Sequence, residues 1–246
     1  MLRFVRIADR ITDILLTAFF VIVFAAGVYS AADTYHIYHS AVSREAFVYK
    51  PGKEDSSAEG TGFTLSDLSD DAVAWIEIAG TGIDHPVMQG ANNSEYLNKD
   101  PFGRYSLSGS IFLDSRNSAD FEDPYSLIYG HHMEGGVMFG ALDSFFDEKY
   151  AKEHRKGTLI LADGTVLDLS LFAVVRTDVS DSAVFDPGDL DGLLAAVREK
   201  AVYYREPETA HVAGLSTCSS ASSGERLVVL FEIGSIPDPQ NAAAAH

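Results

Sequence analysis

Cys218, the only cysteine in this chain of 246 residues, is the residue best suited to chemistry. Without a second cysteine in the chain it forms no internal disulfide, so its thiol is a small buried apolar group, a metal ligand or a nucleophile. An apolar segment, residues 211–215, precedes it, and another, residues 226–233, follows a bend rich in serine and glycine. This pattern predicts that Cys218 lies where a strand ends. Arg226 starts the next strand, where its permanent charge can stabilise a thiolate.

A cysteine nucleophile needs a proton donor or base, and the chain has eight histidines. His131 and His132 follow Gly130 at the end of an apolar strand predicted at residues 126–129, a position where side chains are exposed on a rigid frame. Sequence separation does not show whether two groups meet in the fold. The pattern therefore leaves a second interpretation open, in which both histidines are polar surface residues.

Metal and nucleotide sites have little support in the sequence. Neither Cys-x-x-Cys nor His-Glu-x-x-His occurs, and these are the spacings typical of zinc sites. The pair Gly135-Gly136 lacks the Gly-Lys-Ser/Thr ending of a phosphate-binding loop. We therefore predict neither a metal nor a cofactor.

The formal charge of −18 argues against nucleic acid as a partner. Such acidity is typical of a well-solvated surface. A more specific interpretation is that it attracts a cationic partner that carries an amine.

The N-terminal region predicts a membrane anchor. Residues 14–32 are nineteen consecutive residues without a formal charge, close to the length of about 20 that spans a bilayer as a helix. Arg3, Arg6 and Arg10 precede them, which predicts a cytoplasmic N-terminus and an extracellular remainder. A cleaved signal peptide ending near residues 30–32 is the alternative, but its apolar region would usually be shorter.

The rest of the chain predicts one folded domain built mainly of strands. Short apolar or alternating runs separated by turn signals indicate a β-barrel or sandwich that carries helical insertions. The predicted strands are residues 74–78, 83–88, 110–113, 126–129, 158–161 and 166–175, and helical spacing occurs at 138–146 and at 189–204, where Asp189 is a helix cap. The predicted segments are a cytoplasmic N-terminus at 1–13, an anchor at 14–32, a membrane-proximal helix and linker at 33–64, the folded domain at 65–236 and a tail at 237–246.

The run from Leu215 to Cys218, followed by Arg226 and preceded by residues 128–133 (IYGHHM), resembles the signature of the sortases, cysteine transpeptidases of Gram-positive cell surfaces. Additional segments resemble the class B branch in order and spacing: residues 74–78, 83–87, 95–97, 109–114 and the helix at 189–204. The resemblance covers roughly residues 65–236. It implies a mostly β fold, a sortase-like β-barrel with helical insertions, preceded here by the transmembrane helix.

The resemblance also implies roles for individual residues. Cys218 matches the nucleophile, His131 the general acid, and Arg226 the cation that holds the oxyanion or positions the substrate. His131 is chosen because it directly follows Gly130, whereas His132 matches a variable position. Three positions match the groove for the sorting signal: Ser216, Thr217 and Leu97.

These matches imply a single-pass enzyme of the cell membrane whose catalytic domain is extracellular. It would cleave a sorting-signal peptide of secreted surface proteins through a thioacyl-enzyme intermediate, and transfer the acyl group to an amine of a peptidoglycan precursor or of a pilin. Two alternatives stay open. One is a cysteine hydrolase of the same fold that releases its product to water, and the other is a non-catalytic binding module in which Cys218 is buried and inert.

Overall fold

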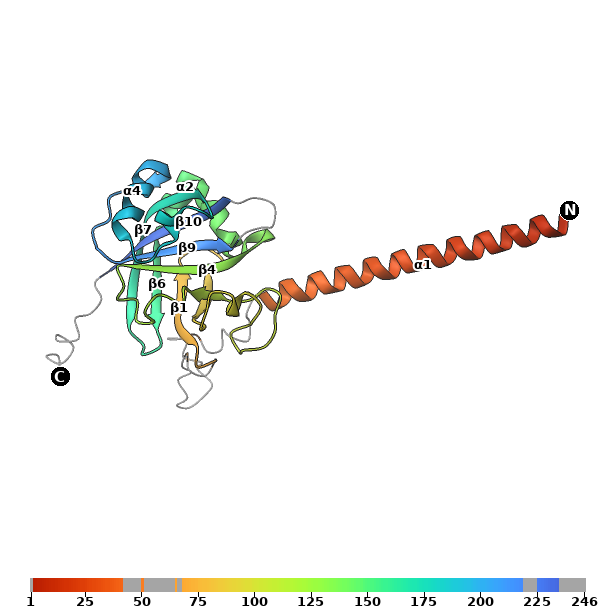
Figure 1. Ribbon diagram of the computed structural model, residues 1–246, viewed down its shortest axis with the longest axis horizontal. Coiled ribbons are helices and arrows are strands. Elements are labelled where there is room, and N and C mark those ends of the chain that lie inside the picture. Colours follow the sequence, from red (N-terminus) through yellow and green to blue (C-terminus); the bar gives the residue numbers. More distant parts are fainter. Residues whose placement is uncertain (1, 42–49, 51–64, 66–67, 219–224, 235–246) are drawn as a thin grey trace. The chain divides into compact units, whose positions relative to one another are not determined.

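The computed structural model describes residues 2–41, 50, 65, 68–218 and 225–234 (Figure 1). The chain divides into two compact units, Met1–His39 and Ser40–His246. The predicted tail at 237–246 and residues 42–49 and 51–64 of the predicted membrane-proximal segment lie outside the described residues.

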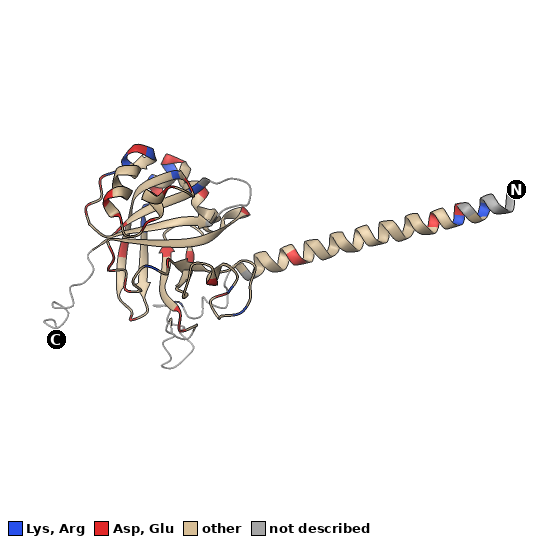
Figure 2. Cartoon of the chain, viewed as in Figure 1, with Lys and Arg blue, Asp and Glu red and all other residues tan. Residues whose placement is uncertain are grey.

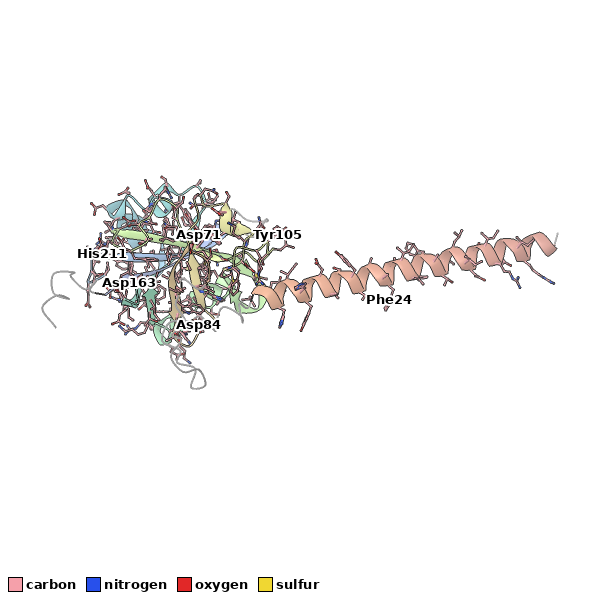
Figure 3. The ribbon with its side chains drawn as sticks, turned by 90° about the horizontal axis from the view of Figure 1, so that it is seen from below. Phe24, Asp71, Asp84, Tyr105, Asp163 and His211 are labelled. Carbon is pink, nitrogen blue, oxygen red and sulfur yellow. The ribbon has the colours of Figure 1, made fainter. Side chains whose placement is uncertain are left out.

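Helix α1 (Leu2–Ala41) includes the predicted anchor and continues on both sides of it. Its apolar side chains are exposed, as Phe24 illustrates at 74% exposure (Figure 3). Its arginines lie at the N-terminal end (Figure 2). Within the part of the chain that the structure describes, this is the one helix long and apolar enough to cross a membrane, over Asp9–His39.

The second unit is a closed β-barrel, which confirms the predicted fold class. Eight strands form a ring in the order β10-β9-β4-β3-β2-β1-β6-β7, and β7 pairs with β10 to close it. Two short strands, β5 and β8, pair with β4 and β7. The strands are β1 (Ala72–Ile78), β2 (Asp84–Met88), β3 (Ile111–Leu113), β4 (Tyr125–Met133), β5 (Val137–Met138), β6 (Lys156–Leu161), β7 (Val166–Asp178), β8 (Ala201–Tyr204), β9 (Val212–Cys218) and β10 (Glu225–Ile233).

Most neighbouring strands are antiparallel, but β2–β3 and β4–β9 are parallel. A parallel pair needs a crossover connection, and helices occupy the long connections of this barrel. They are η3 (Glu95–Leu97), η4 (Glu134–Gly136), η5 (Phe139–Phe146), α2 (Glu148–Glu153), α3 (Ser182–Phe185) and α4 (Leu190–Lys200).

Helix α4 starts as predicted but ends earlier. The Asp189 side chain accepts a hydrogen bond from the Gly192 N–H at 2.8 Å, which confirms the predicted cap. The prediction that the helix continues to residue 204 is wrong, because residues 201–204 form β8. The pairing of β8 with β7 satisfies their backbone groups in a sheet ladder, which outweighs the helical spacing of the sequence.

Apolar side chains fill the barrel and also cover part of its outer surface. Along β1, Ala74, Ile76 and Ile78 are buried in the main core cluster. Helix α4 lies next to β7 (Figure 1). Its Leu193 and Val197 belong to a second cluster with residues of β7 and β10. Strands β7 and β10 therefore pack against apolar side chains on both of their faces.

Candidate active site

Strand β4 is longer than the sequence predicts, and this changes where its histidines lie. Residues 126–129 were predicted to form the strand, with His131 and His132 beyond its end, whereas β4 continues to Met133. The extension is stabilised because β9 pairs with β4 as far as His131, and β5 pairs with His132 and Met133. Both histidines therefore lie on a paired strand.

Strand β9 ends at Cys218, as predicted, and lies parallel to β4. In the register of this pair His131 is the partner of Cys218. Two residues that are 87 positions apart in the sequence are thus neighbours across one ladder. Residues 219–224, which follow the cysteine, lie outside the described residues.

Strand β10 brings Arg226 to the same end of the barrel. The β9–β10 ladder extends to the pair of Ser216 and Val228, which lie two residues from Cys218 and Arg226 along their strands. Arg226 is also paired with Thr177 of β7. Its Nη1 atom is buried and makes no hydrogen bond to the residues that the structure describes. A buried guanidinium nitrogen of this kind can donate to an anionic oxygen of a ligand.

The Arg226 side of the site has an acidic border. The Ser180 hydroxyl and N–H donate to the Asp178 carboxylate at 2.6 and 2.9 Å. These bonds, with a smaller contribution from the positive charge of Arg226, hold the pKa of Asp178 below its usual range. Asp178 is therefore an anion beside the guanidinium.

The His131 ring has a fixed partner on the other side of the site. Its Nε2 lies 2.8 Å from the backbone oxygen of Leu97, the last residue of η3. A carbonyl oxygen only accepts hydrogen bonds, so Nε2 is the donor. The preceding residue, Gly130, lies so close to Phe139 of η5 that a Cβ there would be 2.7 Å from the Phe139 ring.

A buried carboxylate network contacts the segment that leads to Leu97, and no sequence motif predicted a functional role for it. Asp114 is fully buried and accepts bonds from Arg116 at 2.8 and 2.9 Å, from Asn93 at 2.9 Å and from the Tyr129 hydroxyl at 3.2 Å. Burial alone would raise the pKa of Asp114, but the bonds from Arg116 and Asn93 lower it overall. The only sequence signal was a charged residue directly after the apolar β3.

The residues predicted to line a peptide groove lie close to this site but differ in environment. The Ser216 and Thr217 side chains are buried, and Thr217 Oγ1 accepts a hydrogen bond from the Leu227 N–H at 3.4 Å. Leu97 is half-buried and contributes its backbone oxygen to His131. The assignment of all three to substrate binding stays a prediction.

No group of three or more His, Cys, Asp or Glu side chains within the described ranges could hold a metal ion. The structure instead brings a cysteine, an imidazole and a guanidinium to one end of three adjacent strands. Such a set can supply a nucleophile, a proton donor and an oxyanion partner for acyl transfer.

Comparisons with known proteins give several matches, although no protein-family model matches the chain. Sortase B of Listeria monocytogenes is 30% identical over 170 residues, which cover 66% of this chain and 68% of that protein. The crystal structure of a Streptococcus pyogenes class B sortase involved in pilus biogenesis is 41% identical, with a TM-score of 0.65, and the match covers 69% of this chain and 95% of that one. The Staphylococcus aureus sortase B–substrate complex is 28% identical, with a TM-score of 0.62, and covers 70% and 83% of the two chains.

Proposed function

Because this chain belongs to the class B sortases, which are cysteine transpeptidases, we propose that Cys218, His131 and Arg226 are its catalytic residues. The observation that supports this most directly is the register that makes His131 the partner of Cys218 on β4 and β9. Residues paired in register share one face of a sheet, so a nucleophile and its proton donor at these positions can act on one substrate atom.

In the first half of the proposed reaction, the Cys218 thiolate attacks a backbone carbonyl carbon of a sorting peptide. The Arg226 guanidinium donates to the oxyanion that develops, in agreement with its buried Nη1, which makes no hydrogen bond to the described residues. His131 then protonates the departing amine as the C–N bond breaks. The products are a thioacyl enzyme and the released C-terminal part of the peptide.

In the second half, an incoming amine attacks the thioester carbonyl and loses a proton to His131. The C–S bond breaks and Cys218 is restored. The acceptor is an amine of a peptidoglycan precursor or of a pilin, so the product is a surface protein joined to the cell wall or to a pilus. The S. pyogenes relative is involved in pilus biogenesis, which supports a pilin as the acceptor.

The domain organisation fits a reaction at a membrane surface. Residues 14–32 of α1 span the cell membrane with residues 1–13 in the cytoplasm, residues 33–64 connect the anchor to the catalytic domain at 65–236, and residues 237–246 form a tail. The exposed apolar surface of α1 and its N-terminal arginines support this orientation. An anchored enzyme, an anchored substrate and a lipid-linked acceptor would meet on one surface more often than in solution.

The test is to incubate the detergent-solubilised full chain with a library of sorting peptides and a small primary amine. Mass spectrometry should detect an amide product and a thioester adduct on Cys218, both of them lost in Cys218→Ala. Free acid as the only product would favour a cysteine hydrolase of the same fold. A Cys218 thiol that a reagent labels only after unfolding would favour a binding module and contradict the proposal.

A further inference from the structure

The hydrogen bond between His131 and Leu97 determines how the ring carries its proton. Since the Leu97 oxygen accepts from Nε2 at 2.8 Å, the neutral ring is the Nε2–H tautomer and Nδ1 carries the lone pair. Nδ1 makes no hydrogen bond to the described part of the chain. When the ring is protonated, the same bond becomes charge-assisted and stronger, and Nδ1 gains the second proton.

The Leu97 oxygen is held in place by the segment around it. The Tyr96 side chain is fully buried, and its hydroxyl donates to Asp71 at 2.7 Å. The Tyr96 oxygen accepts from the Ser110 N–H at 2.9 Å. At the start of the segment, Asn93 donates to the buried Asp114 at 2.9 Å. The carbonyl that accepts a hydrogen bond from His131 therefore belongs to a segment held in place at Asn93 and at Tyr96.

Gly109 leaves the space that this carbonyl occupies. A Cβ on Gly109 would lie 2.5 Å from the Leu97 oxygen and 2.6 Å from the Tyr96 oxygen, closer than real Cβ contacts. Its φ of +58° is also in the left-handed region, which favours glycine. Any other residue at position 109 would have to move the oxygen that holds His131.

We infer that Gly109 and the Leu97 carbonyl are positioning elements that hold His131 as the Nε2–H tautomer, so that Nδ1 is the atom that exchanges protons. The inference rests on the proposed role of His131. In the first half-reaction the Nδ1 proton passes to the departing amine as the C–N bond breaks. In the second, Nδ1 takes a proton from the incoming amine as the new C–N bond forms and the C–S bond breaks. The Nε2 proton stays on the ring throughout.

The first experiment reads the tautomer directly in the full chain by ¹⁵N NMR of labelled histidine. The His131 signals are assigned by their loss in His131→Gln. Above the pH at which the ring becomes neutral, we expect Nε2 to be protonated and Nδ1 to be unprotonated. A neutral ring with its proton on Nδ1 in the wild-type protein would overturn the inference without any variant.

The second experiment compares Gly109→Ala with Gly103→Ala. Both glycines have positive φ, +58° and +79°, but a Cβ at Gly103 would have no heavy atom within 4 Å. Both variants therefore carry backbone strain, and only Gly109→Ala displaces the Leu97 oxygen. We expect Gly109→Ala to populate the Nδ1–H tautomer, shift the pH–rate profile and lower kcat roughly tenfold or more with little change in KM. Gly103→Ala should match the wild-type protein in all three measurements.

Equal tautomer populations in Gly109→Ala and the wild-type protein would overturn the inference, whatever the activity. If Gly109→Ala does not fold, Asn93→Ala loosens the same segment without a clash and is expected to give the same shift to a smaller extent. The tautomer measurement does not need turnover. Suppose that the wild-type protein has the Nε2–H tautomer but Cys218→Ala still transfers peptide. The proposed function would then be refuted, and the inference about the tautomer would stand.

Discussion

His131 and His132 are neighbours in the sequence but have different partners in the structure. His131 donates to the Leu97 carbonyl, whereas His132 Nε2 lies 2.7 Å from the Asp143 carboxylate of η5. Side chains alternate between the two faces of a strand, so the rings project from opposite faces of β4. His131 is therefore the histidine paired with Cys218 in the β4–β9 register, and His132 connects β4 to η5.

This difference gives a prediction at the residue scale. His131→Ala should lower turnover at least about 100-fold because the proton donor is lost. His132→Ala should retain most of the activity. It removes a pair whose side chains are 29% and 57% exposed, so the free energy of unfolding should fall by less than about 1 kcal/mol. Peptide transfer assays and thermal unfolding measure both effects, and full activity in His131→Ala would move the acid elsewhere.

Arg226 gives the second prediction. Arg226→Lys keeps the charge but loses the planar donor fork, so we expect kcat to fall about 100-fold while the fold stays intact. Arg176→Lys is a matched control on the neighbouring β7, where the guanidinium lies over the Phe146 ring at 4.3 Å. Its rate should stay within about twofold of wild type, since the proposed reaction does not use this guanidinium as a donor to the oxyanion. Wild-type kinetics in Arg226→Lys would remove this residue from the mechanism.

At the scale of elements, β4 and η5 approach each other at Gly130. Gly130→Ala would place a methyl group 2.7 Å from the buried Phe139 ring, so the free energy of unfolding should fall by about 1–3 kcal/mol. The double variant Gly130→Ala/Phe139→Leu makes room for that methyl group. Denaturant unfolding measures the free energy of unfolding of the wild-type protein, the two single variants and the double variant. The loss in the double variant should be smaller than the sum of the two single losses. Additive losses would contradict a direct contact.

The positions of most strands were predictable from the sequence because runs of apolar residues mark them locally. The residues at which β4 and α4 end were not predictable. The limit of β4 depends on pairing with β9 and β5, and the limit of α4 depends on pairing of β8 with β7. Both are contacts with residues far away in the sequence. Short elements such as η3 and α2 were missed because one or two turns carry too little periodicity.

The residues of the candidate site were predictable from the sequence, but the backbone contacts that position them were not. Cys218, His131 and Arg226 were assigned through their motifs, and the structure brings their strands together. Leu97 was predicted for the groove, but its bond to His131 uses a backbone oxygen, which every residue type possesses. No sequence pattern identifies such a contact. Gly109 was part of a matched segment, but the reason it must lack a side chain is its approach to the Leu97 oxygen, a contact that no sequence pattern identifies.

At the scale of the whole molecule, closure of the barrel gives each strand of the candidate site a neighbour on both sides. β9 lies between β4 and β10, and β10 lies between β9 and β7. No edge strand carries a proposed catalytic residue. A closed frame of this kind limits the relative movement of the strands that carry Cys218, His131 and Arg226.

The closed barrel also buries a titratable group, His85 of β2. The residue is 5% exposed and is paired with Ile76, and its Nε2 is buried without a hydrogen-bond partner among the described residues. Burial lowers the pKa of His85 to about 4, against a smaller opposite effect of the Asp84 charge. The folded protein therefore holds this imidazole neutral at pH values where the unfolded chain binds a proton.

This difference predicts how stability depends on pH. Between the ordinary histidine pKa of about 6.5 and a pH of about 4, the unfolded state binds more protons at His85, so the free energy of unfolding falls as the pH falls. A full shift of this size corresponds to roughly 3 kcal/mol. His85→Leu cannot titrate, so its stability should lose this part of the slope, whereas the contribution of the carboxylates stays the same. Trp75, the only tryptophan, is fully buried one strand away and reports unfolding of the full chain by fluorescence in denaturant at each pH. Identical slopes for the wild-type protein and His85→Leu between pH 6.5 and 4 would mean that His85 is protonated in the folded barrel as readily as in the unfolded chain.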